Sequence, residues 1–373
     1  MKNIPLFKVV SQPNFPRIIS NIITSGSISA GSFVTEFAEK FGELVDQKHV
    51  VTVNDMSNAI QIALKIIGVQ PGDEIIASPF ACMSTNAPIF TSGAKPVWVD
   101  INPETGVLDP DAFEAAITTK TKAVIVYHFA GYPAEIEKIK DICDRYEIKL
   151  IEDCDNALMA TVGSRQVGVF GDFAIFSFYP NRQINAMEGG ALCCKNPDDA
   201  ARAIKLRRYG IDLPNFRDSR GEINAQCDVP EIGFAATLNN LCSAVGLAQL
   251  STVYDRVELS RRNDALYRSL LASNKSIELI KVNKNVTPSP WVFPILVENR
   301  DTILLEMKAR GIGVSSVHFD TSQYSGFNVE RIDLPGVDKF YNKVIALPCG
   351  WWMSCEDVNC VVDNLVETIS NSV

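Results

Sequence analysis

Strand-like and helix-like segments alternate along this chain between about residues 50 and 210. Short apolar runs bounded by polar turns are typical of buried strands, and apolar residues at helical spacing are typical of the helices between them. The expected strands cover 74–79, 95–101, 123–128, 149–153, 173–178 and 191–195, and the expected helices cover 57–67 and 133–146. This order predicts an α/β fold in which helices sandwich a mostly parallel sheet.

The pattern changes in the last third of the chain. The elements expected there are a long helix over 238–271, a strand over 291–297, a helix over 301–310, a strand over 313–319 and a closing helix over 356–370. We therefore predict a large domain over residues 1–250, which includes an N-terminal arm, and a smaller α+β domain over 251–373.

Composition and charge argue against several classes of partner. The net charge of −9 and the pI of about 5.0 argue against nucleic acid and against an anionic membrane surface. Ten cysteines without a Cys-x-x-Cys pair and three histidines make a metal site improbable. Neither a signal peptide nor a membrane-spanning segment is expected, so we predict a soluble cytoplasmic protein with free thiols.

Polar residues stand at the carboxyl ends of three expected strands. His128, Asp153 and Ser177 each lie at the end of an apolar run. In open α/β sheets, ligands bind beyond the carboxyl ends of parallel strands. We therefore expect the functional site at this edge of the sheet.

Short motifs follow one another in a fixed order along nearly the whole chain. They lie at residues 31–37, 71–74, 93–97, 128–131, 152–153, 171–172, 177–178 and 188–190. No single motif is specific, but the ordered set resembles the pyridoxal-phosphate (PLP) sugar aminotransferases of the DegT/StrS group. The resemblance implies an aspartate-aminotransferase-like fold with a seven-stranded sheet, and a homodimer with sites at the interface. It also implies a nucleotide-linked sugar as substrate, in polysaccharide or natural-product biosynthesis.

Arg182 conflicts with this resemblance. It lies six residues before the motif at 188–190, where the family has the lysine that forms the Schiff base with PLP. A lysine amine can lose its proton and attack an aldehyde, whereas a guanidinium stays protonated at any physiological pH. PLP, or its amine form PMP, is therefore expected to bind without a covalent link or not at all. Because several pocket positions differ together, natural divergence is a better explanation than one engineered swap.

The resemblance assigns roles to residues near the cofactor. Asp153 would pair with the protonated pyridine nitrogen, and the Ser177 hydroxyl would donate to the phosphate. Asn156 stands where a glutamine or histidine is common. His318 corresponds to a position near the substrate mouth, although a lone histidine ending a strand is slightly more often structural.

The turn that would hold the phosphate departs from the family pattern. A helix N-terminus binds anions through free N–H groups and a positive dipole end. Asp55, Met56 and Ser57 form this turn, where family members usually show Gly-Thr. Asp55 would bring a negative charge to the anion site, or it would cap the helix itself.

Two further positions depart from the family. Cys82 stands where an aromatic side chain usually stacks on the cofactor ring, and Phe80 or Met83 could compensate with polarisable apolar surface. Residues 232–237 lack the asparagine and arginine that reach the neighbouring subunit's site in the family.

Three functions remain open from these residues. The first is a nucleotide-sugar transaminase in which another group replaces the lysine. The second is a lysine-free dehydratase or isomerase that holds PMP or PLP non-covalently, with His128 or Tyr179 moving protons and Arg182 clamping an anion. The third is a non-catalytic homologue that acts as a binding or partner subunit.

Overall fold

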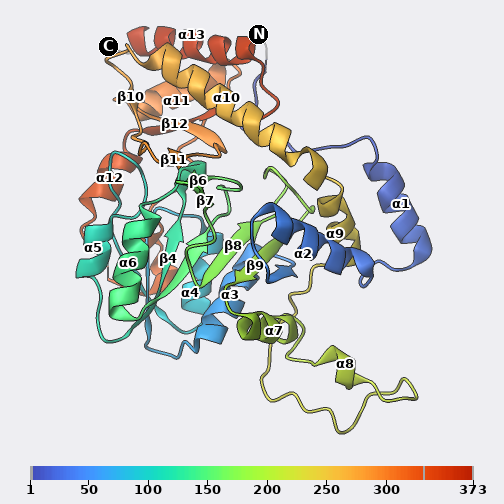
Figure 1. The fold of residues 1–373 in the computed structure, drawn as a ribbon. Helices are drawn as coiled ribbons and strands as arrows, with labels where there is room; N and C mark the ends of the chain where they lie inside the picture. The colour runs from blue at the N-terminus through green and yellow to red at the C-terminus, as the bar shows by residue number, and fades with distance from the viewer. Residues whose placement is uncertain (1–2, 331, 372–373) are drawn as a thin grey trace.

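A seven-stranded sheet forms the centre of the computed structural model, which describes residues 3–330 and 332–371 (Figure 1). The sheet order is β1-β9-β8-β5-β4-β2-β3. The strands are β1 (Val50–Val53), β2 (Glu74–Ala77), β3 (Lys95–Trp98), β4 (Thr121–Tyr127), β5 (Lys149–Asp153), β8 (Phe173–Ser177) and β9 (Gly190–Cys194). Only β9 runs against the other six strands. The predicted mostly parallel sheet between helices is therefore confirmed.

Helices cover both faces of this sheet because its strands are apolar on both sides. The helices of this part are α1 (Phe15–Ser25), α2 (Ser32–Leu44), α3 (Met56–Ile67), α4 (Met83–Thr91), α5 (Pro110–Ala115), α6 (Ile136–Tyr146), α7 (Pro197–Leu206) and α8 (Leu213–Phe216), with the 3-10 turn η1 (Phe129–Gly131). Helix α3 ends at Gly68, whose φ of 84° is left-handed and stops the helix. Helices α1 and α2 were not predicted.

An aromatic cluster packs α2 against the sheet next to the end of β8. The Phe178 ring lies 4.9 Å, centroid to centroid, from both Phe37 and Phe41, and all three side chains are buried. Phe178 directly follows β8. The cluster therefore anchors the start of the segment that leads to Arg182.

The C-terminal part contains a second sheet and a second apolar core. Its sheet joins β10 (Glu278–Leu279), β12 (Val292–Leu296) and β13 (Val344–Pro348) in antiparallel order. Around it lie α10 (Val253–Leu271), α11 (Arg300–Ala309), α12 (Pro335–Tyr341) and α13 (Cys355–Asn371), with the turns η3 (Thr321–Gln323) and η4 (Ser325–Phe327). A small sheet of β11 (Val286–Thr287), β6 (Thr161–Val162) and β7 (Arg165–Gln166) connects the two parts. The domain boundary at residue 250 stays a prediction.

Two predicted elements are wrong. The helix over 238–271 is broken into α9 (Asn240–Leu247), η2 (Leu250–Thr252) and α10. The break lies at Gln249, which is fully buried, and its side chain binds the backbone of Asn185 while its carbonyl accepts from Arg256. The Gln249 carbonyl also accepts from the Thr252 N–H, so it is satisfied without the N–H that a continuous helix would supply.

The strand expected over 313–319 does not form. All seven residues are described, and only Ser315 makes a β-bridge, to Ala346. Val317 has a φ of 68°, which turns the chain out of an extended path. The turn directs the His318 ring toward the main sheet.

No helix among residues 3–330 and 332–371 combines the length and apolar character needed to cross a membrane.

Candidate functional site

The residues predicted for the site gather at the carboxyl edge of the main sheet. Asp153 ends β5 and Ser177 ends β8, and Arg182 lies in the loop after β8. The Thr85 hydroxyl of α4 binds Asp153, and the Ser84 hydroxyl contacts the sulfur of Met56 in α3 at 3.5 Å. The N-termini of α3 and α4 therefore meet the two strand ends, as the position of the predicted site requires.

Arg182 is held by a buried ion pair. Its Nε and Nη2 donate to the two carboxylate oxygens of Asp155, with 2.7 Å between Nη2 and Oδ2. Arg182 is 8% exposed and Asp155 3% exposed. Burial lowers the pKa of Arg182, but the charge and hydrogen bonds of Asp155 outweigh burial and raise it. The guanidinium therefore stays charged, and two of its nitrogens are committed to Asp155.

The remaining sides of the guanidinium are also in contact with protein. Nη1 donates to the Asn181 side chain at 2.6 Å. One face lies on the Trp291 ring, 4.7 Å from its centroid, a distance typical of cation–π contacts. The Trp291 indole N–H binds the Asn181 carbonyl at 3.1 Å. These contacts fix Arg182 in one position.

Buried polar side chains also hold the loop behind Arg182. The amide N–H of Asn185 donates to Gln249, and the Gln249 amide donates back to the Asn185 carbonyl. The Arg256 guanidinium donates to the Gln183 carbonyl at 2.9 Å. The helix break at Gln249, which was not predicted, thus holds the residues that directly follow Arg182.

Asp153 is fully buried and bonded through both oxygens. Its Oδ2 accepts from the Thr85 hydroxyl at 2.7 Å, and its Oδ1 accepts from the Asp155 amide at 3.1 Å. Burial, followed by the charge of Asp155, raises the pKa of Asp153 to about 7, although these hydrogen bonds and Arg182 oppose the rise. At neutral pH this carboxyl group is able both to hold and to release a proton.

Tyr127, at the end of β4, connects two other predicted positions. Its oxygen accepts from the Asn156 amide at 2.6 Å and from the Ala130 N–H at 3.3 Å. The His318 Nε2 lies 3.0 Å from the same oxygen. Burial, helped by the charge of Arg182, lowers the pKa of His318 to about 3, so the ring is neutral. Because the Tyr127 oxygen already accepts two N–H groups, we assign its own proton to a hydrogen bond with His318 Nε2. The Oδ1 of buried Asn156 has no hydrogen-bond partner among the described residues.

His128 lies in a different buried cluster. Its Nδ1 accepts from the Ala134 N–H at 3.1 Å, and its Nε2 lies 3.3 Å from Glu152 Oε2. Glu152 also accepts backbone N–H groups from Gly168, Phe170 and Gly171. Because neighbouring residues of a strand point to opposite faces, Glu152 and His128 face away from Asp153. His128 does not contact Arg182, so this geometry does not support the predicted catalytic role of His128.

The same cluster contains the described group of side chains closest to a metal-binding arrangement. Ligand atoms of His128, Glu152 and Cys154 lie within 4.8 Å of one another. The Glu152 carboxylate is already bonded to three backbone amides, which accounts for its burial. We assign no metal to this cluster.

Asp55 caps α3 at the predicted phosphate turn. Its Oδ1 accepts from the Ser57 N–H at 2.7 Å, and its carbonyl accepts from the Asn58 N–H at 3.1 Å. Two backbone N–H groups of the first turn of α3, those of Ser57 and Asn58, are therefore already bonded to Asp55 and do not face a bound anion. Ser177 accepts from the Tyr179 N–H at 3.2 Å, which leaves its own hydroxyl proton free to donate.

The predicted stacking position is only partly apolar. Cys82 is half-buried at the start of α4, and Met83 is exposed. The Phe80 ring packs into a buried aromatic cluster with Phe129 and His318. Phe80 is therefore committed to the core, and Met83 is the more accessible substitute for the aromatic.

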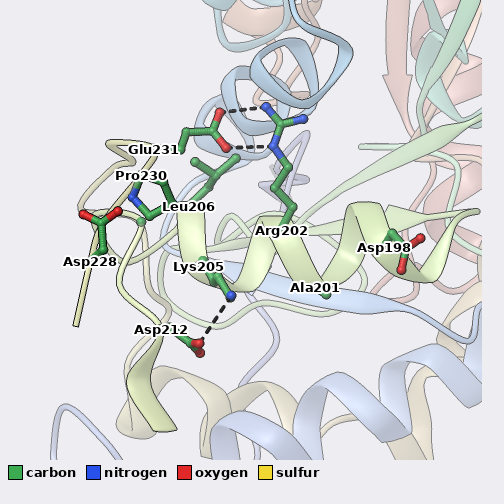
Figure 2. A pocket seen from close by; sticks show the side chains of 10 residues that line it. Asp198, Ala201, Arg202, Lys205, Leu206, Asp212, Asp228, Pro230 and Glu231 are labelled. Atoms are coloured by element: carbon green, nitrogen blue, oxygen red, sulfur yellow. Dashed lines mark hydrogen bonds and ion pairs between the residues drawn. The ribbon is translucent and has the colours of Figure 1, made fainter. Parts of the chain in front are cut away.

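Two cavities differ in how they lie relative to Arg182. A cavity of about 10 Å³ touches Arg182, Asp155 and Ser177, enough for about one water. A cavity of about 560 Å³ lies elsewhere, beside α7, and none of the predicted site residues lines it (Figure 2). Ion pairs of Arg202 with Glu231 and of Lys205 with Asp212 line that cavity.

The raised pKa of Asp153 predicts a pH-dependent stability. Between pH 3.8 and about 7 the folded protein holds a proton that the unfolded chain releases, so the free energy of unfolding falls as pH rises. Asp153→Asn should remove this part of the slope. The lowered pKa of His318 gives the opposite slope between pH 3 and 6.5, but it is common to both proteins and cancels in their difference.

Urea midpoints of wild type and Asp153→Asn at about pH 5 and about pH 7.5 measure the effect. We expect the wild type to lose stability relative to the variant at the higher pH. Parallel pH profiles would contradict it.

Comparison with known proteins places the chain in a family. A sequence model of the DegT/DnrJ/EryC1/StrS aminotransferase family matches residues 12–366. GDP-perosamine synthase of Vibrio cholerae is 26% identical over 380 residues, covering 99% of this chain and all of that protein. The sugar aminotransferase CalS13 from Micromonospora echinospora superimposes with a TM-score of 0.92 at 28% identity, over 99% of this chain and all of CalS13.

A third similar protein is known with its cofactor in two states. Spr1654 from Streptococcus pneumoniae has been solved in a PMP form and a PLP form, with a TM-score of 0.91 at 21% identity over the full length of both chains. The ordered motifs, the seven-stranded sheet and these matches agree: the chain belongs to the DegT/DnrJ/EryC1/StrS aminotransferase family.

Proposed function

We propose that this protein is a lysine-free member of its family that acts on a nucleotide-linked keto or amino sugar and holds PLP or PMP without a covalent link. The observation that carries the proposal is Arg182, buried and paired with Asp155 where the resemblance places the lysine. The similarity to GDP-perosamine synthase and CalS13 supports a sugar substrate.

The donor set suits a pyridine cofactor at one end of the site. Asp153 has lone pairs left to accept an N–H from the ring, and its pKa near 7 suits a shared proton. The Asn156 Oδ1, which has no partner among residues 3–330 and 332–371, would accept a second donor, and the Ser177 hydroxyl would donate to a phosphate. When bound, the cofactor would supply an electron sink. Arg182 would act as a fixed positive charge.

The same residues exclude covalent attachment at position 182. A guanidinium bonded to Asp155 has no free electron pair to offer an aldehyde. His128 supports the sheet edge through Glu152 and does not replace the lysine in this proposal. Asp153 is the titratable group that we assign to proton exchange.

One observation favours a second function, that of a non-catalytic binding or partner subunit. Asp55 fills the α3 N-terminus with its own carboxylate, so a phosphate there would meet a like charge. A chain that no longer binds the cofactor phosphate would retain the fold and its partner surfaces.

We include a homodimer in the proposal. The segment around α8 projects from the body in Figure 1, and it carries exposed apolar side chains, Leu213 and Ile223, with Ile232 following. Ile23 of α1 is also exposed. A second copy of this chain would bury these side chains, which single chains rarely leave exposed in groups.

The cofactor proposal is tested on the purified protein. Absorbance is recorded with and without added PLP or PMP, and borohydride treatment is followed by intact mass. We expect cofactor absorbance that survives gel filtration, without a mass adduct. An adduct would show that another lysine has taken over, and no absorbance with excess cofactor would leave the partner-subunit function.

The dimer proposal is tested by light scattering coupled to gel filtration. Wild type should have twice the chain mass of 41.0 kDa. Ile223 is 63% exposed and Ile232 is 72% exposed. The double substitution Ile223→Asp with Ile232→Asp should shift the protein to the monomer, because the dimer would bury charges without partners.

Leu305→Asp is the matched control, since Leu305 is 67% exposed on α11, in the C-terminal part. It should leave the mass unchanged. A monomeric wild type, or a variant pair that stays dimeric, would contradict the proposal.

A further inference from the structure

The geometry points to Asp155 as a second determinant of the missing covalent chemistry: we infer that Asp155, and not Arg182 alone, keeps this chain from attaching PLP. The inference rests on the proposed function, since it concerns the same site. It assigns a role to a residue that the resemblance does not mark. It predicts that restoring a lysine at position 182 is not enough.

The position of Asp155 is fixed by the turn after β5. The Cys154 N–H donates to the Ile175 carbonyl at 2.9 Å, and the Asp155 N–H donates to Asp153 Oδ1 at 3.1 Å. The side chain is 3% exposed, and both oxygens face Arg182. The backbone at Asp155 is therefore held, and the carboxylate cannot turn into solvent without breaking its ion pair with Arg182.

A lysine at position 182 would place its amine between the same two oxygens. The lysine Nζ is as many bonds from Cα as the arginine Cζ, the atom that joins the two nitrogens bonded to Asp155. Asp153 is less available as a partner because Thr85 and the Asp155 amide already bind it. Asp155 would thus be the principal counter-ion of the new ammonium group.

That ammonium group would be hard to deprotonate. A carboxylate within about 4–6 Å raises an amine's pKa by roughly one to three units, and each unit lowers the neutral fraction about tenfold. Attachment requires the neutral amine, whose lone pair forms the bond to the aldehyde carbon of PLP while one water leaves. The proton must first leave the amine, and the Asp155 charge opposes its departure.

The test compares four variants with wild type: Arg182→Lys, Asp155→Asn, the double variant Arg182→Lys/Asp155→Asn, and a control. Each is incubated with PLP, treated with borohydride, and analysed by intact mass and by peptide mapping around residue 182. Asparagine keeps the size of Asp155 and removes its charge. The control is Arg182→Lys/Asp172→Asn, because Asp172 binds Lys149 and the Leu150 N–H at the opposite edge of the sheet.

We expect no adduct at position 182 in wild type or Asp155→Asn. The double variant should label at least about tenfold faster than Arg182→Lys, following the estimated shift of one pKa unit or more. The control should label like Arg182→Lys. Equal rates for Arg182→Lys and the double variant, or a faster control, would overturn the inference.

A folded double variant that does not label at position 182 with excess PLP would also overturn it. Arg182→Lys/Asp155→Ala repeats the test if the asparagine variant does not fold, as judged by circular dichroism and urea unfolding. The proposed function has its own readout, the non-covalent binding by wild type. Labelling of the double variant without non-covalent binding by wild type would remove the proposed function and leave the inference standing. Non-covalent binding by wild type without labelling of the double variant would do the reverse, so the two failures are distinguishable.

Discussion

A buried ion pair between Arg182 and Asp155 determines what the site can do. Taking two charges out of water costs several kcal/mol per ion, and only close, hydrogen-bonded geometry offsets that cost. Here both carboxylate oxygens are bonded, Asn181 binds a third nitrogen, and Trp291 covers a face of the guanidinium. Removing either partner would leave the other charge buried and alone, so the two residues form one unit.

The fold brings the two partners together from separate strands. Asp155 follows β5 and Arg182 follows β8, which are neighbours in the sheet and run parallel. The aromatic cluster around Phe178 holds the start of the second segment, and Gln249 holds its end through Asn185. The same ion pair affects Asp153. Burial and the negative charge of Asp155 raise the pKa of Asp153 to about 7, and the positive charge of Arg182 opposes this rise.

The sheet was predictable because its strands are buried on both faces and appear as continuous apolar runs. The break at Gln249 was not, since a buried glutamine bonded to a distant loop leaves no mark on helical periodicity. His128 and Asp153 both end predicted strands, but the alternation of side chains across a strand places Glu152 and His128 on the other side. Asp155 lies two residues after β5, and nothing in the sequence pattern marked it as a site residue. Its role became visible only through its contact with Arg182 in the structure.

A double-mutant cycle over Arg182 and Asp155 tests this account most directly. The free energy of unfolding in urea is measured for wild type, Arg182→Met, Asp155→Ala and the double variant. We expect each single change to cost roughly 3–5 kcal/mol and the double variant to recover about 2 kcal/mol or more of their sum. Additivity within about 0.5 kcal/mol would show that the two side chains act independently, and it would contradict the account.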